Sequence, residues 1–520
     1  MNHNDIVQKL WNLCDVLRDD GINYSDYVTE LVLLLFIKMV HENTEAETLD
    51  KHTLPEGCRW VDLHEKSGIN LLDDYKRILL ALSTGKDAAG NSIHEDPLIS
   101  AIYADAQTRL REPRHLEQMI KTLDQIDWFS VQKDGLGDLY EGLLEKNATE
   151  TKSGAGQYFT PRDLIDSMVR CIKPQPGETV QDPAAGTAGF LVAADQYMRK
   201  QTDDYIDLNA KDAAFQKNKA FIGIELVPST RRLALMNCLL HGMEGDDEGV
   251  VHLGNALGEQ GAALASADII LANPPFGTSK GGNAGITREF TYQTSNKQLA
   301  FLQHIYRNLK PGGRAAVVLP DNVLFESGVG TEVRRDLMNK CNLHTILRLP
   351  TGIFYAAGVK TNVLFFTKGS AKDKLQDENC TENVWVYDLR TNMPSFGKRT
   401  PFGEQHLRPF EKVYGDKPDG TSERQEGEYS FNAEEIEPPQ VEENQGVDPR
   451  LVHSRWRVFS RDWIREHKGD SLDISWLKDA DSVDAADLPE PRVLASEAKD
   501  ELTAALAEID ELLEALGESI

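Results

Sequence analysis

Between about residues 150 and 370, short β-rich runs alternate with stretches of helical pattern, and this alternation constrains the fold more than any other feature of the chain. It predicts βαβ units and a parallel sheet covered by helices on both faces. Because ligands of such sheets bind at the carboxyl ends of the strands, motifs at those ends carry the most functional weight. The candidate strands are 179–181, 221–225, 269–272, 315–319 and 363–367, with candidate helices near 188–199, 229–241 and 299–309.

The regions on either side of this alternation have different sequence patterns. Residues 1 to about 145 read as mostly helical, with a helical apolar stripe of Ile6, Leu10, Leu13 and Leu17 and buried-helix patterns at 31–40 and 71–82. After about residue 400 the chain is rich in Pro, Gly and Glu, which predicts long loops.

The last segment, 473–520, carries 14 acidic and 3 basic side chains. Within it a heptad stripe runs for about two repeats, formed by Leu502, Leu506, Ile509, Leu513 and Leu516. A stripe this short needs a partner surface to be helical. That surface is either the core of this chain or another subunit.

Charge and cysteine content narrow the class of protein. The 520 residues include 56 Lys and Arg against 84 Asp and Glu, a formal charge of −28, so any contact with nucleic acid needs a local positive groove or a partner subunit. The six cysteines are scattered without a C-x-x-C pair, which argues against a zinc site or disulfides and fits a reducing compartment. The longest apolar run, 31–37, is too short to span a bilayer, and no signal peptide is evident. We expect a cytoplasmic protein without a metal.

The strongest local signal is the run Asn273-Pro274-Pro275-Phe276, directly after a candidate strand. Two consecutive prolines cannot donate ladder hydrogen bonds, so the strand must stop there. An Asn side-chain oxygen and a neighbouring carbonyl are together able to accept from one flat amino group, and Phe276 offers a face for stacking a planar ring. The structural alternative is a rigid turn with an apolar plug.

A second signal, DPAAGTAGF at 182–190, follows the first candidate strand and opens a helix. Its small residues permit a sharp turn and a close approach of the backbone to a ligand. Glu225 ends the strand FIGIE, where an acid is able to accept both hydroxyls of a ribose, as in nucleotide-binding βαβ folds. A structural turn and a solvated strand end are the alternatives.

A third signal, GAGQYFTP at 154–161, precedes the sheet. Thr160 is a good N-cap and Pro161 a good first helical residue, so a helix is predicted to start here. Capping does not explain the glycine-rich loop with two aromatic residues before it, which suits a lid over a small ligand.

Together these runs resemble the amino-group methyltransferases that use S-adenosylmethionine and, more closely, the modification (methylase) subunits of type I restriction–modification systems. The resemblance covers most of the chain, including the helical N-terminal region, the closing strand region at 358–366 and the acidic C-terminal helix. It implies an α/β fold with a methyltransferase-type Rossmann-like sheet, mostly parallel with an antiparallel closing strand. The implied parts are a helical N-terminal domain (1–145), a methyltransferase domain (146–400), a loop-rich extension (401–472) and an acidic helical tail for subunit docking (473–520).

The resemblance also implies roles for single residues. Asn273 and Pro274 would hold the target amino group, Pro275 would shape the loop and Phe276 would stack on the base. Glu225 would bind the cofactor ribose, and Asn255 would lie near its adenine. The other residues implied to line the cofactor are Gln157, Tyr158, Phe159, Thr160, Pro161, Arg162, Asp182, Gly186, Thr187, Ala188 and Gly189.

The implied activity is transfer of a methyl group from S-adenosyl-L-methionine to the 6-amino group of adenine in a specific duplex DNA sequence, with the target adenine flipped out, which protects host DNA from restriction. A separate specificity subunit would read the sequence, with two methylase subunits for each specificity subunit. Restriction subunits would complete the nuclease. The stripe from Leu502 to Leu516 is the candidate for docking on the specificity subunit.

Three other functions stay open. A methyltransferase acting on a glutamine side chain or on ribosomal RNA uses a related Asn-Pro-Pro-aromatic turn, but the long helical N-terminal region and the acidic tail disfavour it. The 4-amino group of cytosine is a second target within the DNA class. A non-catalytic scaffold that keeps only the fold is disfavoured by the intact set of Asn273–Phe276, Gly186–Gly189 and Glu225.

Overall fold

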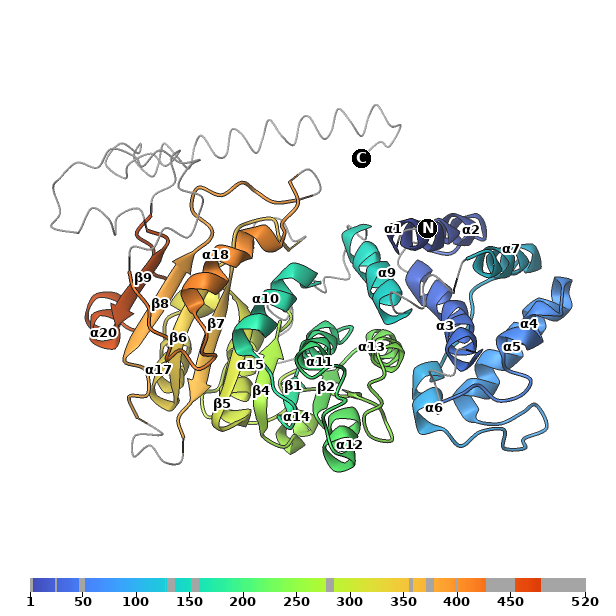
Figure 1. Cartoon of the computed structure of the whole chain (residues 1–520), viewed down its shortest axis with the longest axis horizontal. Helices are drawn as coiled ribbons and strands as arrows, with labels where there is room; N and C mark the ends of the chain where they lie inside the picture. The colour runs from blue at the N-terminus through green and yellow to red at the C-terminus, as the bar shows by residue number, and fades with distance from the viewer. Residues whose placement is uncertain are drawn as a thin grey trace. The chain divides into compact units, whose positions relative to one another are not determined.

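Figure 1 shows the computed structural model of the chain. The structure describes residues 3–23, 26–45, 52–126, 128, 136–150, 159–276, 285–354, 359–370, 378–397, 400–426 and 454–477. Gln157, Tyr158 and the heptad stripe at 502–516 lie outside these ranges. Met1–Ser475 form one compact unit and Trp476–Ile520 a second.

The N-terminal region is helical, as the apolar patterns predict. Its most hydrophobic helix, α3 (Tyr27–Glu45), is buried on all sides from Glu30 to Val40, with Leu31 to Ile37 fully inaccessible to solvent. The stripe that begins at Ile6 is divided at Asn12 between two helices, and its four apolar residues are all buried. Among the described residues, none of the helices has the length and apolarity needed to cross a membrane. The helices are α1 (His3–Trp11), α2 (Leu13–Asp19), α3 (Tyr27–Glu45), α4 (Trp60–His64), α5 (Gly68–Thr84), α6 (Pro97–Tyr103), α7 (Pro113–Asp124) and α9 (Leu136–Glu150).

A nine-stranded sheet organises the rest of the described chain. Its strands lie in the order β3-β2-β1-β4-β5-β7-β6-β8-β9. The first five are parallel, while β7 lies antiparallel between β5 and β6. This confirms a mostly parallel sheet with an antiparallel strand. The strands are β1 (Val180–Asp182), β2 (Phe221–Glu225), β3 (Val251–Leu253), β4 (Ala267–Ala272), β5 (Leu309–Pro320), β6 (Cys341–Arg348), β7 (Thr361–Lys368), β8 (Asn383–Asp388) and β9 (Trp456–Ser460).

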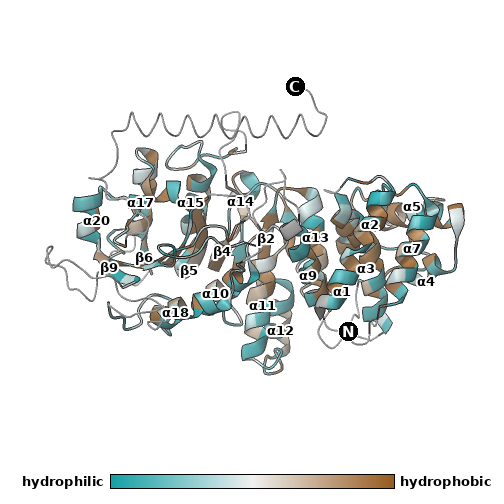
Figure 2. Ribbon diagram, turned by 90° about the horizontal axis from the view of Figure 1, so that it is seen from above, coloured by the Kyte–Doolittle hydropathy of each residue, from teal (hydrophilic) through white to brown (hydrophobic). Residues whose placement is uncertain are grey.

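Helices cover both faces of the sheet, as βαβ units require. α15 and α17 lie on one face, and α10, α11 and α18 lie on the other (Figures 1 and 2). Figure 2 shows hydrophobic residues concentrated in the strands between these layers and in α3. The helices are α10 (Arg162–Ile172), α11 (Gly189–Gln201), α12 (Ala210–Asn218), α13 (Pro228–Leu240), α14 (Glu259–Ala263), α15 (Lys297–Asn308), α16 (Asp321–Phe325), α17 (Val329–Lys340), α18 (Glu404–Tyr414) and α20 (Arg461–Lys468).

The sheet is larger than the sequence pattern indicates. The five predicted strands are present; four have ends within two residues of the prediction, whereas β5 begins six residues earlier, and β3, β6, β8 and β9 are additional. Within 401–472, where the composition predicts loops, the structure has α18, β9 and α20. β9 pairs antiparallel with β8 and forms an edge of the sheet.

The helical N-terminal region is joined to the sheet region by buried contacts. Arg232 of α13 donates from Nε to the carbonyl of Ile102 in α6 over 2.7 Å, and its guanidinium also contacts the carbonyl of Ala104. Tyr140 of α9 donates to the sulfur of Met236 in α13. α13 therefore packs against both α6 and α9.

Candidate active site

The predicted motifs meet at the carboxyl edge of the sheet, where the strand order reverses. The chain proceeds from β1 outward through β2 and β3, returns to β4 beside β1, and then continues to β5 on the other side. Helices leave the neighbouring strands on opposite sides of such a point, which opens a crevice for ligands. The DPAAGTAGF turn and Asn273 stand at the ends of the neighbouring strands β1 and β4, so both lie at this point of the sheet edge.

The turn after β1, residues 183–188, has an unusual backbone. Gly186 has φ +55° and Ala188 has φ +69°, both in the left-handed region. This conformation is strained for an alanine. Ala188 is the N-cap of α11, and it provides no side-chain acceptor for the first turn of that helix. The first turn of α11 therefore presents backbone N–H groups without a capping side chain, as an anion site requires.

Glu225 lies directly beside this turn, at the end of β2. Its carboxylate accepts from the backbone N–H of Gly186 over 3.0 Å and from that of Val227 over 2.8 Å. Burial raises the pKa of Glu225, and these hydrogen bonds partly oppose the rise. Each carboxylate oxygen has capacity for a further donor. The position suits the predicted ribose acceptor, and it adds a role in holding the turn.

Asp182, the last residue of β1, is almost completely buried. Burial, helped by the charge of the nearby Glu225, raises its pKa to about 8, although the N–H of Ala184 donates to its carboxylate over 2.9 Å and opposes the rise. A carboxyl group with this pKa is mostly protonated at neutral pH. Asp182 therefore holds the turn through its hydrogen bond from Ala184 while carrying little charge.

Asn273 projects from the end of β4 toward the start of α10. Its Nδ2 donates to the hydroxyl of Thr160 over 2.8 Å. Because this bond fixes the donor end of the amide, it also fixes the direction of the Oδ1 acceptor. Two motifs that are far apart in the chain are thereby joined in one site.

The prolines and the aromatic residue that follow are held in place by neighbouring elements. Pro274 is buried and Pro275 is exposed, and the carbonyl of Pro275 accepts from Nε2 of Gln298 in α15 over 3.0 Å. Phe276 is partly buried and makes an edge-to-face contact with Phe354, with ring centroids 5.8 Å apart.

The structure corrects the predicted role of Thr160 as an N-cap. Pro161 occupies the N-cap position of α10, no side chain caps this helix, and the Thr160 hydroxyl contacts Asn273 instead. Arg162 begins α10, and its guanidinium contacts Glu141, Asp166 and Gln196. This side chain therefore links α9, α10 and α11.

The remaining predicted residues lie around the same edge. Asn255 follows β3, where its Oδ1 accepts from the N–H of Leu257 over 2.9 Å and its Nδ2 donates to the carbonyl of Gly285 over 2.7 Å. Phe159 is partly buried just before Thr160. The carbonyl of Thr187 accepts from Nδ2 of Asn237 in α13 over 3.0 Å, a partner that the sequence reading missed.

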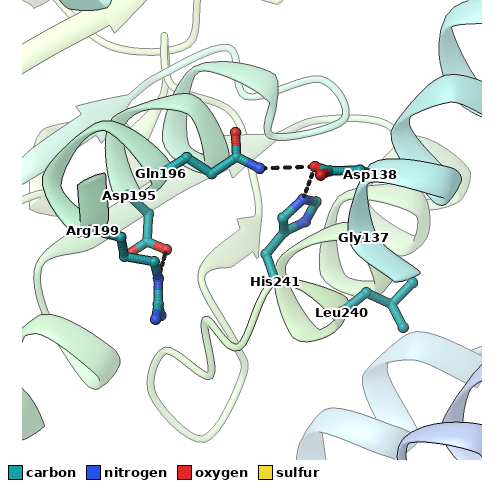
Figure 3. A pocket seen from close by; sticks show the side chains of 7 residues that line it. All are labelled: Gly137, Asp138, Asp195, Gln196, Arg199, Leu240 and His241. Atoms are coloured by element: carbon teal, nitrogen blue, oxygen red, sulfur yellow. Dashed lines mark hydrogen bonds and ion pairs between the residues drawn. The ribbon is translucent and has the colours of Figure 1, made fainter. Parts of the chain in front are cut away.

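The sequence patterns do not predict a polar cluster formed by Asp138, Gln196 and His241. Nε2 of Gln196 donates to Asp138 over 3.0 Å, and His241 lies 3.5 Å from the same carboxylate, beside a cavity of about 200 Å³ (Figure 3). Burial alone would lower the pKa of His241, but the hydrogen bond to Asp138 and the charge of Glu141 raise it.

Ligand atoms of Asp138, Glu141 and His241 lie within 4.8 Å of one another, a spacing that suits a divalent cation. However, the guanidinium of Arg162 already pairs with Glu141. The carboxylate charge is therefore balanced within the protein.

Family models match three parts of the chain. Residues 131–455 match the family described as N-6 DNA Methylase. Residues 6–123 match the HsdM N-terminal domain, and residues 488–519 match the C-terminal domain of type I restriction enzyme methylase subunits. The fold and the site thus define a methyltransferase of the N-6 DNA methylase class.

Individual relatives narrow this class. The chain is 58% identical over 526 residues to the type I restriction enzyme EcoKI methylase subunit of Escherichia coli (strain K12), covering 100% of this chain and 96% of that relative. It is 31% identical to the EcoEI methylase subunit of Escherichia coli, covering 81% and 85%. The crystal structure of the EcoKI M protein aligns with a TM-score of 0.60 at 54% identity, covering 99% of this chain and 97% of that chain.

The chain belongs to the methylase subunits of type I restriction enzymes. The resemblance inferred from the motifs, the α/β fold class and the assignment to adenine-directed DNA methylases are confirmed at the level of the family.

Proposed function

We propose that this chain transfers a methyl group from S-adenosylmethionine to the 6-amino group of adenine in duplex DNA, with the chemistry at Asn273 and Pro274. The observation that carries this proposal is the hydrogen bond from Asn273 to Thr160, beside the glycine-rich turn at the point where the strand order reverses. It joins a candidate amino-group acceptor to the segment that precedes α10. Cofactor and target would meet in one crevice.

The residues around the turn fit the cofactor. The uncapped N-terminus of α11 suits the carboxylate of the methionine part. Glu225 would accept hydrogen bonds from the ribose hydroxyls. The side-chain amide of Asn255 is already bonded to Leu257 and Gly285, so Asn255 would border the adenine through the backbone around it. Phe159 to Pro161 would close the other side. When bound, S-adenosylmethionine supplies a methyl group that is already activated by a positively charged sulfur.

Asn273 and Pro274 would act on the target nitrogen. The 6-amino nitrogen of adenine is a weak nucleophile because its lone pair is delocalised into the ring. Oδ1 of Asn273 and the carbonyl of Pro274 would accept its two N–H groups and favour a pyramidal nitrogen, an interaction that strengthens toward the transition state. The N6–methyl bond forms as the sulfur–methyl bond breaks, and one N6 proton leaves to water.

Phe276 and the edge of the crevice would hold the base. The target nitrogen is inaccessible inside a duplex, so the adenine must be flipped out of the stack. The ring of Phe276, supported edge-on by Phe354, would stack on it. Alignment of nitrogen, methyl and sulfur contributes much of the remaining acceleration.

Partner subunits follow from the charge of the chain and from its family. A chain with a formal charge of −28 is poorly suited to find one DNA sequence by itself. We therefore propose that a specificity subunit reads the DNA, that two methylase subunits bind each specificity subunit, and that restriction subunits complete the nuclease. The segment that matches the methylase C-terminal domain, 488–519, contains the proposed docking stripe. The site of action would be the cytoplasm.

Transfer of a labelled methyl group tests this function. The chain is incubated with labelled S-adenosylmethionine and duplex DNA, alone and with the specificity subunit encoded beside it. We expect label in DNA only in the mixture, recovered as 6-methyladenine at one sequence. Label recovered as 4-methylcytosine would show that the target base is cytosine and not adenine. Label only in protein or RNA would overturn DNA as the substrate class.

A further inference from the structure

Asn237 connects the glycine-rich turn to the helical region that precedes the sheet. It lies on α13, is 1% exposed, and donates from Nδ2 to the carbonyl of Thr187 over 3.0 Å and to the carboxylate of Glu141 in α9 over 3.3 Å. We propose that Asn237 is a positioning residue that holds the cofactor turn in its binding conformation and ties it to α9. This inference rests on the proposed use of the turn to bind S-adenosylmethionine.

The turn needs an external constraint because its backbone is strained. Ala188 adopts φ +69°, a conformation that persists only where surrounding contacts determine it. On one side Glu225 holds the N–H of Gly186. On the other side Asn237 holds the carbonyl of Thr187, which belongs to the same peptide group as the N–H of Ala188. The second contact therefore sets the peptide that leads into the N-terminus of α11.

The orientation of the Asn237 amide is unambiguous. Both partners of Nδ2 are acceptors, so the reversed amide would place an oxygen against a carbonyl and a carboxylate. In the described part of the chain, Oδ1 of Asn237 is buried and has no hydrogen-bond partner. A buried unsatisfied acceptor is costly, so the contribution of this asparagine to the structure comes from its donor group.

Two side-chain contacts, one helical turn apart, link α13 and its C-cap to α9. Glu141 contacts Asn237, and Asp138, one turn earlier on α9, contacts His241, the C-cap residue of α13 (Figure 3 shows the second contact). Arg162 pairs with Glu141, and Gln196 of α11 donates to Asp138. Polar side chains thus connect α11, which begins at the end of the turn, with α9. A shift of α9 would be transmitted to Thr187 through Asn237.

Cofactor affinity tests this role. In the full chain we expect Asn237→Ala to raise the Kd for S-adenosylmethionine about tenfold, measured by calorimetry, as expected for loss of the buried hydrogen bond that holds the carbonyl of Thr187. In the complex with the specificity subunit and DNA, KM for S-adenosylmethionine should rise similarly while kcat and KM for DNA stay close to wild type. Asn237→Asp keeps the side-chain shape without the donor and should raise the Kd at least as much.

Cys238→Ala is the matched control, because Cys238 is equally buried on the same helix and should leave the Kd within twofold of wild type. A wild-type Kd in both Asn237 variants, or a lower kcat at unchanged KM, would overturn the positioning role. A wild-type chain that does not bind S-adenosylmethionine would overturn the proposed function instead.

A double-mutant cycle tests the link to α9. Glu141→Ala should weaken cofactor binding by itself and add little in the Asn237→Ala background, because both act through Thr187. Strictly additive effects would restrict the role of Asn237 to the turn and overturn the link.

Discussion

The side-chain amide of Asn273 donates a hydrogen bond of 2.8 Å to the hydroxyl of Thr160, 113 positions earlier in the chain. The bond orients the residue proposed to accept the target amino group, and its partner belongs to the segment proposed to line the cofactor. If both proposed roles hold, target positioning and cofactor binding share this one contact.

Removing the Thr160 hydroxyl should impair chemistry more than cofactor binding. Thr160→Val keeps the shape but leaves Nδ2 of Asn273 without this acceptor, so we expect kcat to fall on the order of tenfold. Thr160→Ser should retain most of the activity. Single-turnover methylation rates measure the effect, and equal rates for the Val and Ser variants would contradict it.

Removing the Asn273 side chain should abolish methyl transfer. We expect Asn273→Ala to lower kcat by about 10² to 10³, the usual effect of deleting a group that stabilises the transition state. The Kd for S-adenosylmethionine, measured by calorimetry, should be nearly unchanged because Asn273 follows β4 rather than the turn. Loss of both together would argue against the assigned roles.

The buried Asp182 should make folding stability depend on pH. Its folded pKa of about 8 lies above the ordinary value of 3.8, so the stabilisation is complete below about pH 4 and is lost as pH rises toward 8. We expect Asp182→Asn to gain stability relative to wild type with rising pH, by at most about 1.4 kcal/mol per pH unit.

Urea denaturation at pH 5.5, 6.5 and 7.5 measures this difference. Asp73→Asn, at an exposed position on α5, is the control and should differ from wild type by a constant amount. A constant difference for Asp182→Asn as well would show that the carboxyl group is ionised in the folded state.

Deleting the residues after Pro491 should separate assembly from cofactor binding. The elements of the proposed pocket lie within the compact unit that ends at Ser475, so the Kd for S-adenosylmethionine should be unchanged. Co-purification with the specificity subunit should be lost if 502–516 form the docking helix. A truncated chain that still assembles would place the interface elsewhere.

The sequence predicted best where a single physical rule applied. β2 and the part of β4 after Asp268 are apolar runs that end at a polar residue, Glu225 and Asn273, and both are predicted at nearly their true ends. β3 has three residues and includes a histidine, while β6 mixes polar and apolar residues that are all largely buried. β3 is too short for its alternation to be recognised, and β6 has neither a regular period-2 alternation nor an uninterrupted apolar run.

The site shows the same division. The strand-end positions of Asn273 and Glu225 followed from local patterns, but their partners did not. Thr160 looked like a helix cap because capping is a local rule, whereas the contact that it makes depends on a residue after β4. Asn237 and Glu141 carry no motif, since their importance comes only from where α9 and α13 pack.

The placement of β7 between β5 and β6 has a consequence for synthesis of the chain. β6 leaves the ribosome before β7, yet β6 is joined to β5 only through β7, which lies between them in the sheet. Until residues 361–368 have emerged, the nascent protein exposes the edge of β5 and holds β6 unpaired on that side. Open strand edges of this kind invite pairing with other chains. The interval between the emergence of residue 320 and that of residue 368 is therefore the one in which a nascent-chain chaperone would protect this subunit most.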